Sequence, residues 1–254
     1  MTTDPKHSIR HHAICSASSA YRWIQCSGSV ALNKDLPRVD SIHAIEGTVA
    51  HEYAESILRN WLEGTPVMNF TDCPEEMEEA VQRYIKFVKE KTKEYDHKPT
   101  IRIESKLSLK EDFDMWGTAD IAMTGVKDGK SHGKIIDLKY GKTKVIAKNN
   151  PQLAYYGAAL INTSKRPLDT VEVVIYQPRI DVPATSVTYE NKDLRVWEAV
   201  LTGAAERALR QLIGTDEKSF NRGDWCKWCN AKKICPAMKD AEVNGEALEF
   251  MENL

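Results

Sequence analysis

Two residues near the middle of the chain have the types and the spacing of a catalytic pair. Asp137 and Lys139 follow the apolar residues Ile135 and Ile136, which predict a short buried strand. Residues two apart on a strand point to the same face, so the carboxylate and the ammonium are expected to meet at one spot. The alternative is an ordinary solvated strand face, because an Asp-x-Lys sequence is common.

A second carboxylate, Asp120, precedes this pair and lies in another apolar run, residues 115–122. The segment between the two runs, residues 126–133, is rich in turn-forming residues, which predicts an antiparallel hairpin. Two acids and a lysine that meet on one sheet suit phosphodiester hydrolysis assisted by Mg²⁺ or Mn²⁺. In such chemistry the carboxylates bind the metal, the metal helps to activate water, and the lysine stabilises charge on the phosphate.

The elements that must position these residues can be predicted from the spacing of the apolar residues. Repeats of three and four residues predict a short helix within 16–26 and longer helices over 46–63, 74–95, 150–162 and 191–213. Alternation and β-branched runs predict strands over 101–109, 115–122, 134–140, 170–176 and 185–189. Residues 27–29 are expected to break the first helix, and residues 33–45 to form a loop. This order predicts a mixed α/β (α+β) fold with a mixed central sheet flanked by helices.

The composition narrows the classes of protein that fit. The chain has 254 residues, of which 42% are apolar and 28% charged, as in a soluble globular domain. The formal net charge of −2 excludes a globally basic nucleic-acid-binding protein, so any DNA surface would be a local patch. We find neither an apolar run long enough to span a membrane nor a signal-peptide core, and expect a cytoplasmic protein without membrane partners.

Three cysteines near the C-terminus form a C-x2-C-x5-C pattern, Cys226, Cys229 and Cys235. Three thiols are one short of a four-ligand metal site. The candidates for the fourth ligand are the remaining cysteines, Cys15, Cys26 and Cys73. Cys26 is preferred because it ends a predicted helix beside a Ser-Gly-Ser turn. The site could hold zinc or an iron–sulfur cluster and would join the N- and C-terminal segments, whereas free thiols are the alternative.

A run of lysines follows the predicted active strand and leads to the next helix. Its members are Lys139, Lys142, Lys144 and Lys148. The run could be a strip that contacts DNA phosphates or, equally well, a solvated loop.

Several short motifs occur in a fixed order along the chain: Gly47-x3-His51, Gly117-x2-Asp120, Asp137-x-Lys139 and Gln152-x3-Tyr156. In this order they resemble the RecB-type branch of the PD-(D/E)XK nuclease superfamily. One upstream cysteine plus the C-terminal cysteine pattern resembles the iron–sulfur subgroup of that branch. The subgroup includes AddB-type helicase–nucleases and exonucleases associated with CRISPR adaptation. Segments 16–29 and 137–142 most resemble nucleases of phages and prophages, and the whole resemblance covers residues 14–240.

The resemblance implies a restriction-endonuclease-like core and roles for individual residues. His51, Asp120 and Asp137 would bind the catalytic Mg²⁺ or Mn²⁺ together with the backbone carbonyl of Leu138. Lys139 would orient the attacking water and stabilise the transition state. The remaining implied site residues are Glu104, a candidate metal-site carboxylate on the first core strand, and Gln152 and Tyr156, which would position the DNA backbone and the active site. Gln152 could instead be a helix-surface amide, and Tyr156 a core aromatic.

The resemblance also implies a function and partners. The protein would be a metal-dependent DNA exonuclease with a structural 4Fe-4S cluster held by Cys26, Cys226, Cys229 and Cys235. It would act on DNA ends, single- or double-stranded, in phage recombination or end processing. Because the sequence has no helicase region, unwinding would need a helicase or recombination partner, and a homo-oligomer is compatible with the sequence. The alternatives are a nuclease-like DNA-binding module with little catalysis and a zinc-stapled endonuclease.

The predicted organisation is one nuclease domain between two short terminal segments. Residues 1–13 are expected to be a flexible N-terminus, and residues 241–254 a C-terminal tail. The domain, residues 14–240, would contain a helical insert over about 46–95, a catalytic core over about 100–190 and a cluster loop over 220–236.

Overall fold

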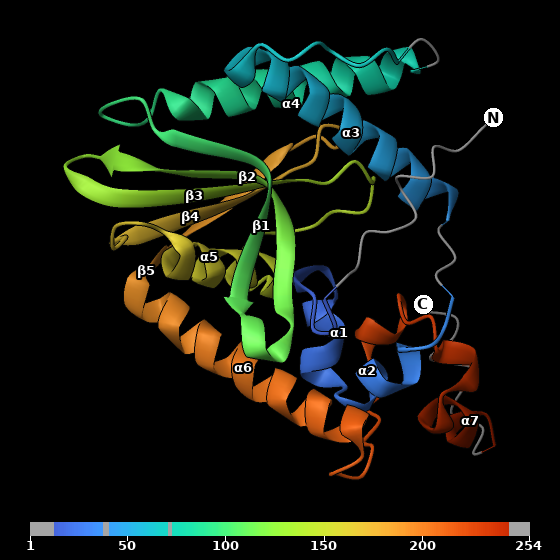
Figure 1. Ribbon diagram of the computed structural model, residues 1–254. Coiled ribbons are helices and arrows are strands. Elements are labelled where there is room, and N and C mark those ends of the chain that lie inside the picture. The colour runs from blue at the N-terminus through green and yellow to red at the C-terminus, as the bar shows by residue number, and fades with distance from the viewer. Residues whose placement is uncertain (1–12, 38–40, 71–72, 244–254) are drawn as a thin grey trace.

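A five-stranded mixed sheet with the order β1-β2-β3-β4-β5 is the centre of the fold (Figure 1). The computed structural model describes residues 13–37, 41–70 and 73–243. The strands are β1 (Thr100–Lys110), β2 (Met115–Lys127), β3 (Lys130–Leu138), β4 (Thr170–Tyr176) and β5 (Ala184–Glu190). Only the β3–β4 pair is parallel, and the other neighbouring strands are antiparallel. The predicted mixed α/β fold is confirmed.

The predicted hairpin is the β2–β3 pair, and its strands are longer than the sequence indicated. Asp128 and Gly129 form a two-residue turn with φ of 51° and 74°. Such left-handed turns match the twist of paired strands, so the ladder continues to the Lys127–Lys130 pair at the tip. The Asp96 carboxylate accepts hydrogen bonds from both turn amides at 3.0 Å, which holds the tip in place.

Two layers of helices enclose the sheet (Figure 1). On one face, α3 (Ile42–Glu63) and α4 (Glu75–Thr92) pack on one apolar cluster. On the other face, α5 (Pro151–Thr163) and α6 (Asn191–Ile213) pack on a second cluster. β4 contributes side chains to both clusters, which explains why its sequence is a continuous apolar run rather than an alternating one.

The N-terminal segment lies beside the C-terminal one (Figure 1). It contains α1 (Ala20–Gln25) and α2 (Gly28–Asn33), and the C-terminal segment ends in α7 (Pro236–Val243). The Gly28 amide donates to the Ser219 carbonyl at 3.0 Å, and the Asn221 amide donates to the Gln25 carbonyl at 2.8 Å. The segment that carries α1 and α2 therefore packs against residues 219–221, and the predicted joining of the two segments by a metal cluster stays a prediction.

One local prediction is confirmed and another is wrong. The first helix ends at Gln25, before residues 27–29, as predicted, and a second short helix, α2, begins directly at Gly28. A Cβ there would lie 2.5 Å from the Ser219 carbonyl oxygen, so the glycine serves close packing rather than a turn. The loop predicted over 33–45 ends early, because the Ser41 hydroxyl caps α3 by accepting from the Ala44 amide at 3.2 Å.

The terminal segments fall mainly outside the described residues. Of the expected flexible N-terminus only residue 13 is described, and of the expected tail only residues 241–243. Within the described ranges, no helix has the length and apolar character needed to cross a membrane.

Candidate active site

Three carboxylates lie in one row across three neighbouring strands. Glu104 on β1 lies opposite Asp120 on β2 in the antiparallel register. Asp120 in turn comes directly after the last β2–β3 pair, Ile121–Ile136, so it lies opposite Asp137 on β3. Glu104 has a positive φ of 44°, which is costly for a residue with a side chain. The strand register therefore gathers acids that are far apart in the sequence.

Asp120 separates β2 from β3 at this row. Its Oδ2 accepts a hydrogen bond from the Leu138 amide at 2.6 Å. A side-chain oxygen of β2 thus replaces the backbone carbonyl that would accept this hydrogen bond if the two strands stayed paired. The two strands diverge from here, and the carboxylates of Asp120 and Asp137 lie in the opening. Leu138, whose carbonyl was predicted as a metal ligand, is therefore held directly beside Asp120.

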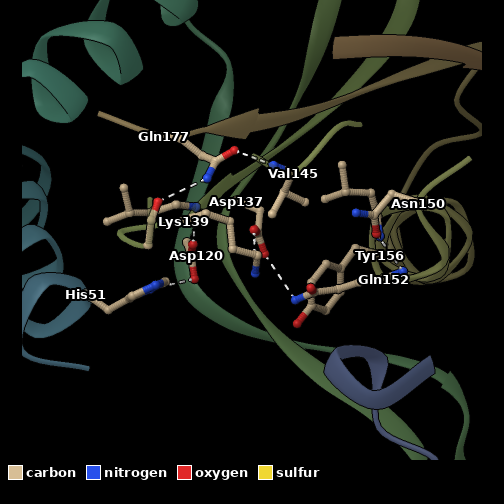
Figure 2. Close-up of polar contacts among 12 residues, drawn as sticks. His51, Asp120, Asp137, Lys139, Val145, Asn150, Gln152, Tyr156 and Gln177 are labelled. Carbon is tan, nitrogen blue, oxygen red and sulfur yellow. Dashed lines mark hydrogen bonds and ion pairs between the residues drawn. The ribbon is translucent and has the colours of Figure 1, made fainter. Parts of the chain in front are cut away.

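His51 reaches the row from the helical layer above the sheet. α3 places its Nδ1 3.1 Å from Asp120 Oδ1 (Figure 2). The same nitrogen lies 3.9 Å from Glu104 Oε1. Burial by itself lowers the pKa of His51, but the two carboxylates outweigh it and raise that pKa to about 10. Within the described residues, these three side chains form the one group of possible metal ligands whose ligand atoms all lie within 4.8 Å of one another.

Asp137 is held from both sides in a nearly solvent-free position. Its Oδ2 lies 2.7 Å from the Lys139 ammonium, and its Oδ1 accepts from Gln152 Nε2 at 3.1 Å (Figure 2). The side chain is 4% exposed, and burial raises the pKa of Asp137 although Lys139 opposes the shift. Oδ2 is fully enclosed, and the Lys139 ammonium is its charged partner.

Gln152 is aimed at Asp137 by the start of α5. The Asn150 side chain caps this helix, accepting from the Gln152 amide at 3.0 Å and from the Leu153 amide at 3.3 Å. Pro151 occupies the first helical position, where its missing N–H is not needed. The orientation of Gln152 therefore follows from a local helix-start signal, Asn-Pro.

Tyr156 fixes β2 rather than facing solvent. Its hydroxyl donates to the Thr118 carbonyl at 2.7 Å, and its side chain is buried. The ring lies so close to the strand that a Cβ at Gly117 would stand 2.9 Å from it. Gly117 and Tyr156, which belong to separate motifs of the sequence, therefore contact each other directly. This contact positions β2, the strand that carries Asp120.

The predicted site residues line a single open cleft of about 2060 Å³, including the solvent at its mouth. The cleft is lined by His51, Glu104, Asp120, Asp137, Lys139, Gln152 and Tyr156, among others. Lys142, Lys144 and Lys148 are exposed, but none of them belongs to this lining.

Comparisons with known proteins place the chain in a family. Residues 12–253 match the family described as "Protein of unknown function (DUF2800)". The chain belongs to the DUF2800 family. A solved structure of a provisionally assigned exonuclease from Eubacterium rectale aligns over 92% of this chain and 93% of its own, with a TM-score of 0.52 and 14% identity. The alkaline exonuclease LHK-Exo of Laribacter hongkongensis aligns over 77% of this chain and 91% of its own, with a TM-score of 0.34 and 15% identity.

The similarity to the Eubacterium rectale structure shows that the DUF2800 chain shares its overall fold, in agreement with the predicted restriction-endonuclease-like core. At 14% identity the similarity extends to the fold alone. The assignments to the RecB-type branch and to its iron–sulfur subgroup stay predictions.

Sequence reasoning missed one buried residue of the DUF2800 site, Gln177, which follows β4 (Figure 2). Its amide nitrogen donates to the carbonyls of Gly141 and Thr143 at 3.1 and 2.9 Å, and its oxygen accepts from the Val145 amide at 2.7 Å. These bonds fix the loop between Lys139 and α5. No sequence pattern marks Gln177, because its partners are backbone groups more than thirty residues away.

A second cavity, of about 360 Å³, brings together the N-terminal and C-terminal cysteines. It is lined by Cys26, Cys226, Cys229 and Cys235, with Arg22 and Trp225 among the other lining residues. Of the candidates for a fourth ligand, Cys15 and Cys73 do not line it. In the described chain, the four sulfurs do not form a group within 4.8 Å of one another.

One of the four thiols also has nitrogen donors. Asn33 Nδ2 lies 3.3 Å from Cys229 Sγ, and an Arg22 guanidinium nitrogen lies 4.0 Å from the same sulfur. Such donors stabilise the thiolate, the form that binds metals.

Proposed function

We propose that this DUF2800 protein is a metal-dependent DNA nuclease that hydrolyses phosphodiester bonds, and more specifically an exonuclease. The observation that carries the proposal is the row of Glu104, Asp120 and Asp137, completed by Lys139 and Gln152 in one open cleft. Two carboxylates and a lysine on diverging strands are the groups that phosphoryl-transfer chemistry requires. The exonuclease assignments of the structural relatives agree with it but are not its basis.

The donor set suits a divalent cation. Carboxylate oxygens and an imidazole are ligands that Mg²⁺ or Mn²⁺ accept. His51, Asp120 and Asp137 would hold the ion beside the Leu138 carbonyl, with Glu104 completing the carboxylate set. A bound cation supplies Lewis acidity and lowers the pKa of a coordinated water.

The protein groups have separate tasks in this proposal. Lys139 stabilises the charge that develops on the phosphate and orients the attacking water. Gln152 keeps Asp137 in position through its hydrogen bond to Oδ1. Tyr156 and Gln177 do not contact the reacting atoms and act as positioning residues for β2 and for the loop that follows Lys139.

The charges of the cleft argue against a DNA-binding module without catalysis. Among the described residues, five carboxylates line the cleft against Lys106, Lys139 and His51, whose raised pKa keeps it protonated at neutral pH. Without a cation the cleft would therefore repel a phosphate backbone. A divalent ion bound by these carboxylates would neutralise their charge and attract the phosphate. The same carboxylates would then hold the metal that assists hydrolysis.

We further propose that Cys26, Cys226, Cys229 and Cys235 hold a 4Fe-4S cluster. Support comes from the shared cavity, which the four cysteines line together. The cluster would stabilise the contact between the chain ends, and iron and sulfide analysis of anaerobically purified protein tests it. Purified protein that contains zinc but no iron would refute the cluster and support a zinc site at these cysteines.

DNA cleavage tests the main proposal. End-labelled linear and closed circular DNA, each single- and double-stranded, would be incubated with Mg²⁺ or Mn²⁺ and with wild-type protein or Asp137→Asn. We expect metal-dependent loss of linear DNA by the wild type, and none by the variant at an unchanged melting temperature. Cleavage of circles would make the protein an endonuclease. Folded, metal-supplied protein that cleaves nothing would refute the nuclease assignment.

Recombination or end processing in phages, and a helicase or recombination partner, are proposed on the sequence resemblance alone.

A further inference from the structure

One face of the β1–β2 pair extends the cleft beyond the carboxylates. Because strand side chains alternate, Trp116 and Thr118 share a face of β2 with Asp120, and Lys106 shares a face of β1 with Glu104. The register places Lys106 opposite Thr118, next to the pair that contains Trp116. All five side chains line the cleft.

Lys106 and Trp116 form a pair at the far end of this face. The Lys106 ammonium lies 4.3 Å from the centroid of the indole ring. The indole is oriented by a hydrogen bond from its Nε1 to Asp114 Oδ1 at 2.9 Å. Trp116 belongs to neither apolar core cluster, although a tryptophan usually packs into the interior.

Lys106 differs from the other lysine of the cleft in its charge balance. Lys139 is paired with Asp137 at 2.7 Å. Lys106 is exposed, and over the described parts of the chain no carboxylate lies within 4.0 Å of its ammonium. An uncompensated cation over an aromatic ring, in an otherwise acidic cleft, is suited to an anionic ligand that also has a flat π-face.

We propose that Lys106 and Trp116 bind a single strand of DNA, with Trp116 stacking on an unpaired base and Lys106 contacting a phosphate. This inference rests on the nuclease function proposed above and specifies its substrate. Four residues along a strand span about 14 Å, which separates Trp116 from Asp120 by roughly four stacked nucleotides, or fewer in an extended strand. The pair would therefore hold the strand a few nucleotides from the bond that is cut.

Two arguments favour a single strand over a duplex. An aromatic side chain can stack only on a base that is free of its neighbours, and such stacking is typical of single-strand binding. A single strand also carries half the linear charge density of a duplex, so it suits a cleft with five carboxylates better.

Binding measured without cleavage tests the proposal. In the Asp137→Asn background, fluorescence anisotropy would give the affinity for a labelled thymidine 12-mer and for a 12-mer of abasic residues. Trp116→Ala should weaken thymidine binding about 5- to 150-fold and leave abasic binding unchanged, because only the base stacks. Trp116→Phe should retain part of the affinity and guards against misfolding of the alanine variant.

Lysine variants separate the phosphate contact from the stacking contact. Lys106→Ala should weaken binding of both oligomers and reduce the slope of log affinity against log salt by about 0.7. Two matched controls, Lys93→Ala and Trp228→Ala, remove exposed side chains outside the cleft lining and should change neither affinity.

Three results would overturn the proposal. The first is that the folded Trp116→Ala and Trp116→Phe variants bind the thymidine 12-mer with the parent affinity. The second is that Trp116→Ala loses the same affinity for the thymidine 12-mer and for the abasic 12-mer. The third is wild-type protein that cleaves duplex DNA but does not bind the thymidine 12-mer. That last result would leave the nuclease function standing and refute only the single-strand site, whereas absence of cleavage on every substrate would refute the function itself.

Discussion

Lys134 lies in β3 with its side chain fully buried, and its charge is neutralised by two carboxylates. Its ammonium is 2.5 Å from Glu94 Oε2 and 2.9 Å from Glu172 Oε2. Glu94 also pairs with Lys91 and Lys127 at the surface. The substitution Lys134→Met keeps the length and apolar stem of the side chain but removes the buried charge. Glu172, 12% exposed, would then lose its nearest cation, while Glu94 would keep two.

The expected cost follows from this burial. Removing one partner of a buried ion pair destabilises a protein by about 3–5 kcal/mol, because the remaining charge stays buried without compensation. For a chain of this size each kcal/mol corresponds to roughly 2–4 °C in melting temperature, so a fall of roughly 6–20 °C is expected. Removing both charges is often neutral, so Lys134→Met combined with Glu172→Gln should recover most of the loss.

Thermal and urea unfolding would measure these differences. Lys130→Met, at an exposed position of the same strand, is the matched control and should change stability by no more than about 0.5 kcal/mol. A loss below 1 kcal/mol for Lys134→Met, or a double variant less stable than the single one, would refute the reasoning. Either result would mean that solvent or other groups compensate Glu172 when the lysine is gone.

Three further predictions concern the active site, the cysteine cavity and the acid stability of the fold. Gln152→Ala should slow single-turnover DNA cleavage roughly 10- to 150-fold at unchanged melting temperature, since a hydrogen bond to a charged group contributes about 1.5–3 kcal/mol; a change below twofold would exclude a positioning role. Cys229→Ser should abolish the visible absorbance and iron content of anaerobically purified protein, and an unaltered spectrum would remove Cys229 from the ligand set. Burial, followed by the charge of Lys134, lowers the pKa of His132 from 6.5 to about 4. As the pH falls, the unfolded chain therefore binds the proton before the folded protein does, and about 3 kcal/mol of stability should be lost between pH 6.5 and pH 4. Urea midpoints at pH 7.5 and 4.5, measured for the wild type and for His132→Asn, would test this. Equal pH dependence of the two proteins would contradict it.

Local periodicity predicted most of the elements correctly. β4 and α6 have the predicted bounds, and the β2–β3 hairpin pairs as its turn sequence indicated. Contacts with distant segments were not predictable in this way. Gly28 is required because the Ser219 carbonyl leaves no room for a Cβ, and that contact is invisible in the local sequence.

The candidate site divides in the same way. The spacing of Asp137 and Lys139 predicted that they share a face, and the 2.7 Å separation of their charged atoms agrees. His51 was assigned to the site only through the family resemblance, because nothing in its helix distinguishes a ligand from a solvent-facing histidine. Gln177, Lys106 and Trp116 carried no recognisable motif, and each depends on which strands are neighbours.

The sequence by itself determined the elements, the hairpin, the faces of each strand and the chemical types available for catalysis. Each of these depends on residues a few positions apart, whose relative directions are set by the 2.0- and 3.6-residue periods. The tertiary structure alone decided that Glu104 on β1 joins the row of Asp120 and Asp137, and that α3 brings His51 to that row. It also places Cys26 in one cavity with the C-terminal cysteines, whereas the sequence indicated only a preference among three candidates. Those contacts depend on strand register and on the packing of helices against the sheet, which are set by the burial of the whole apolar core rather than by any short segment.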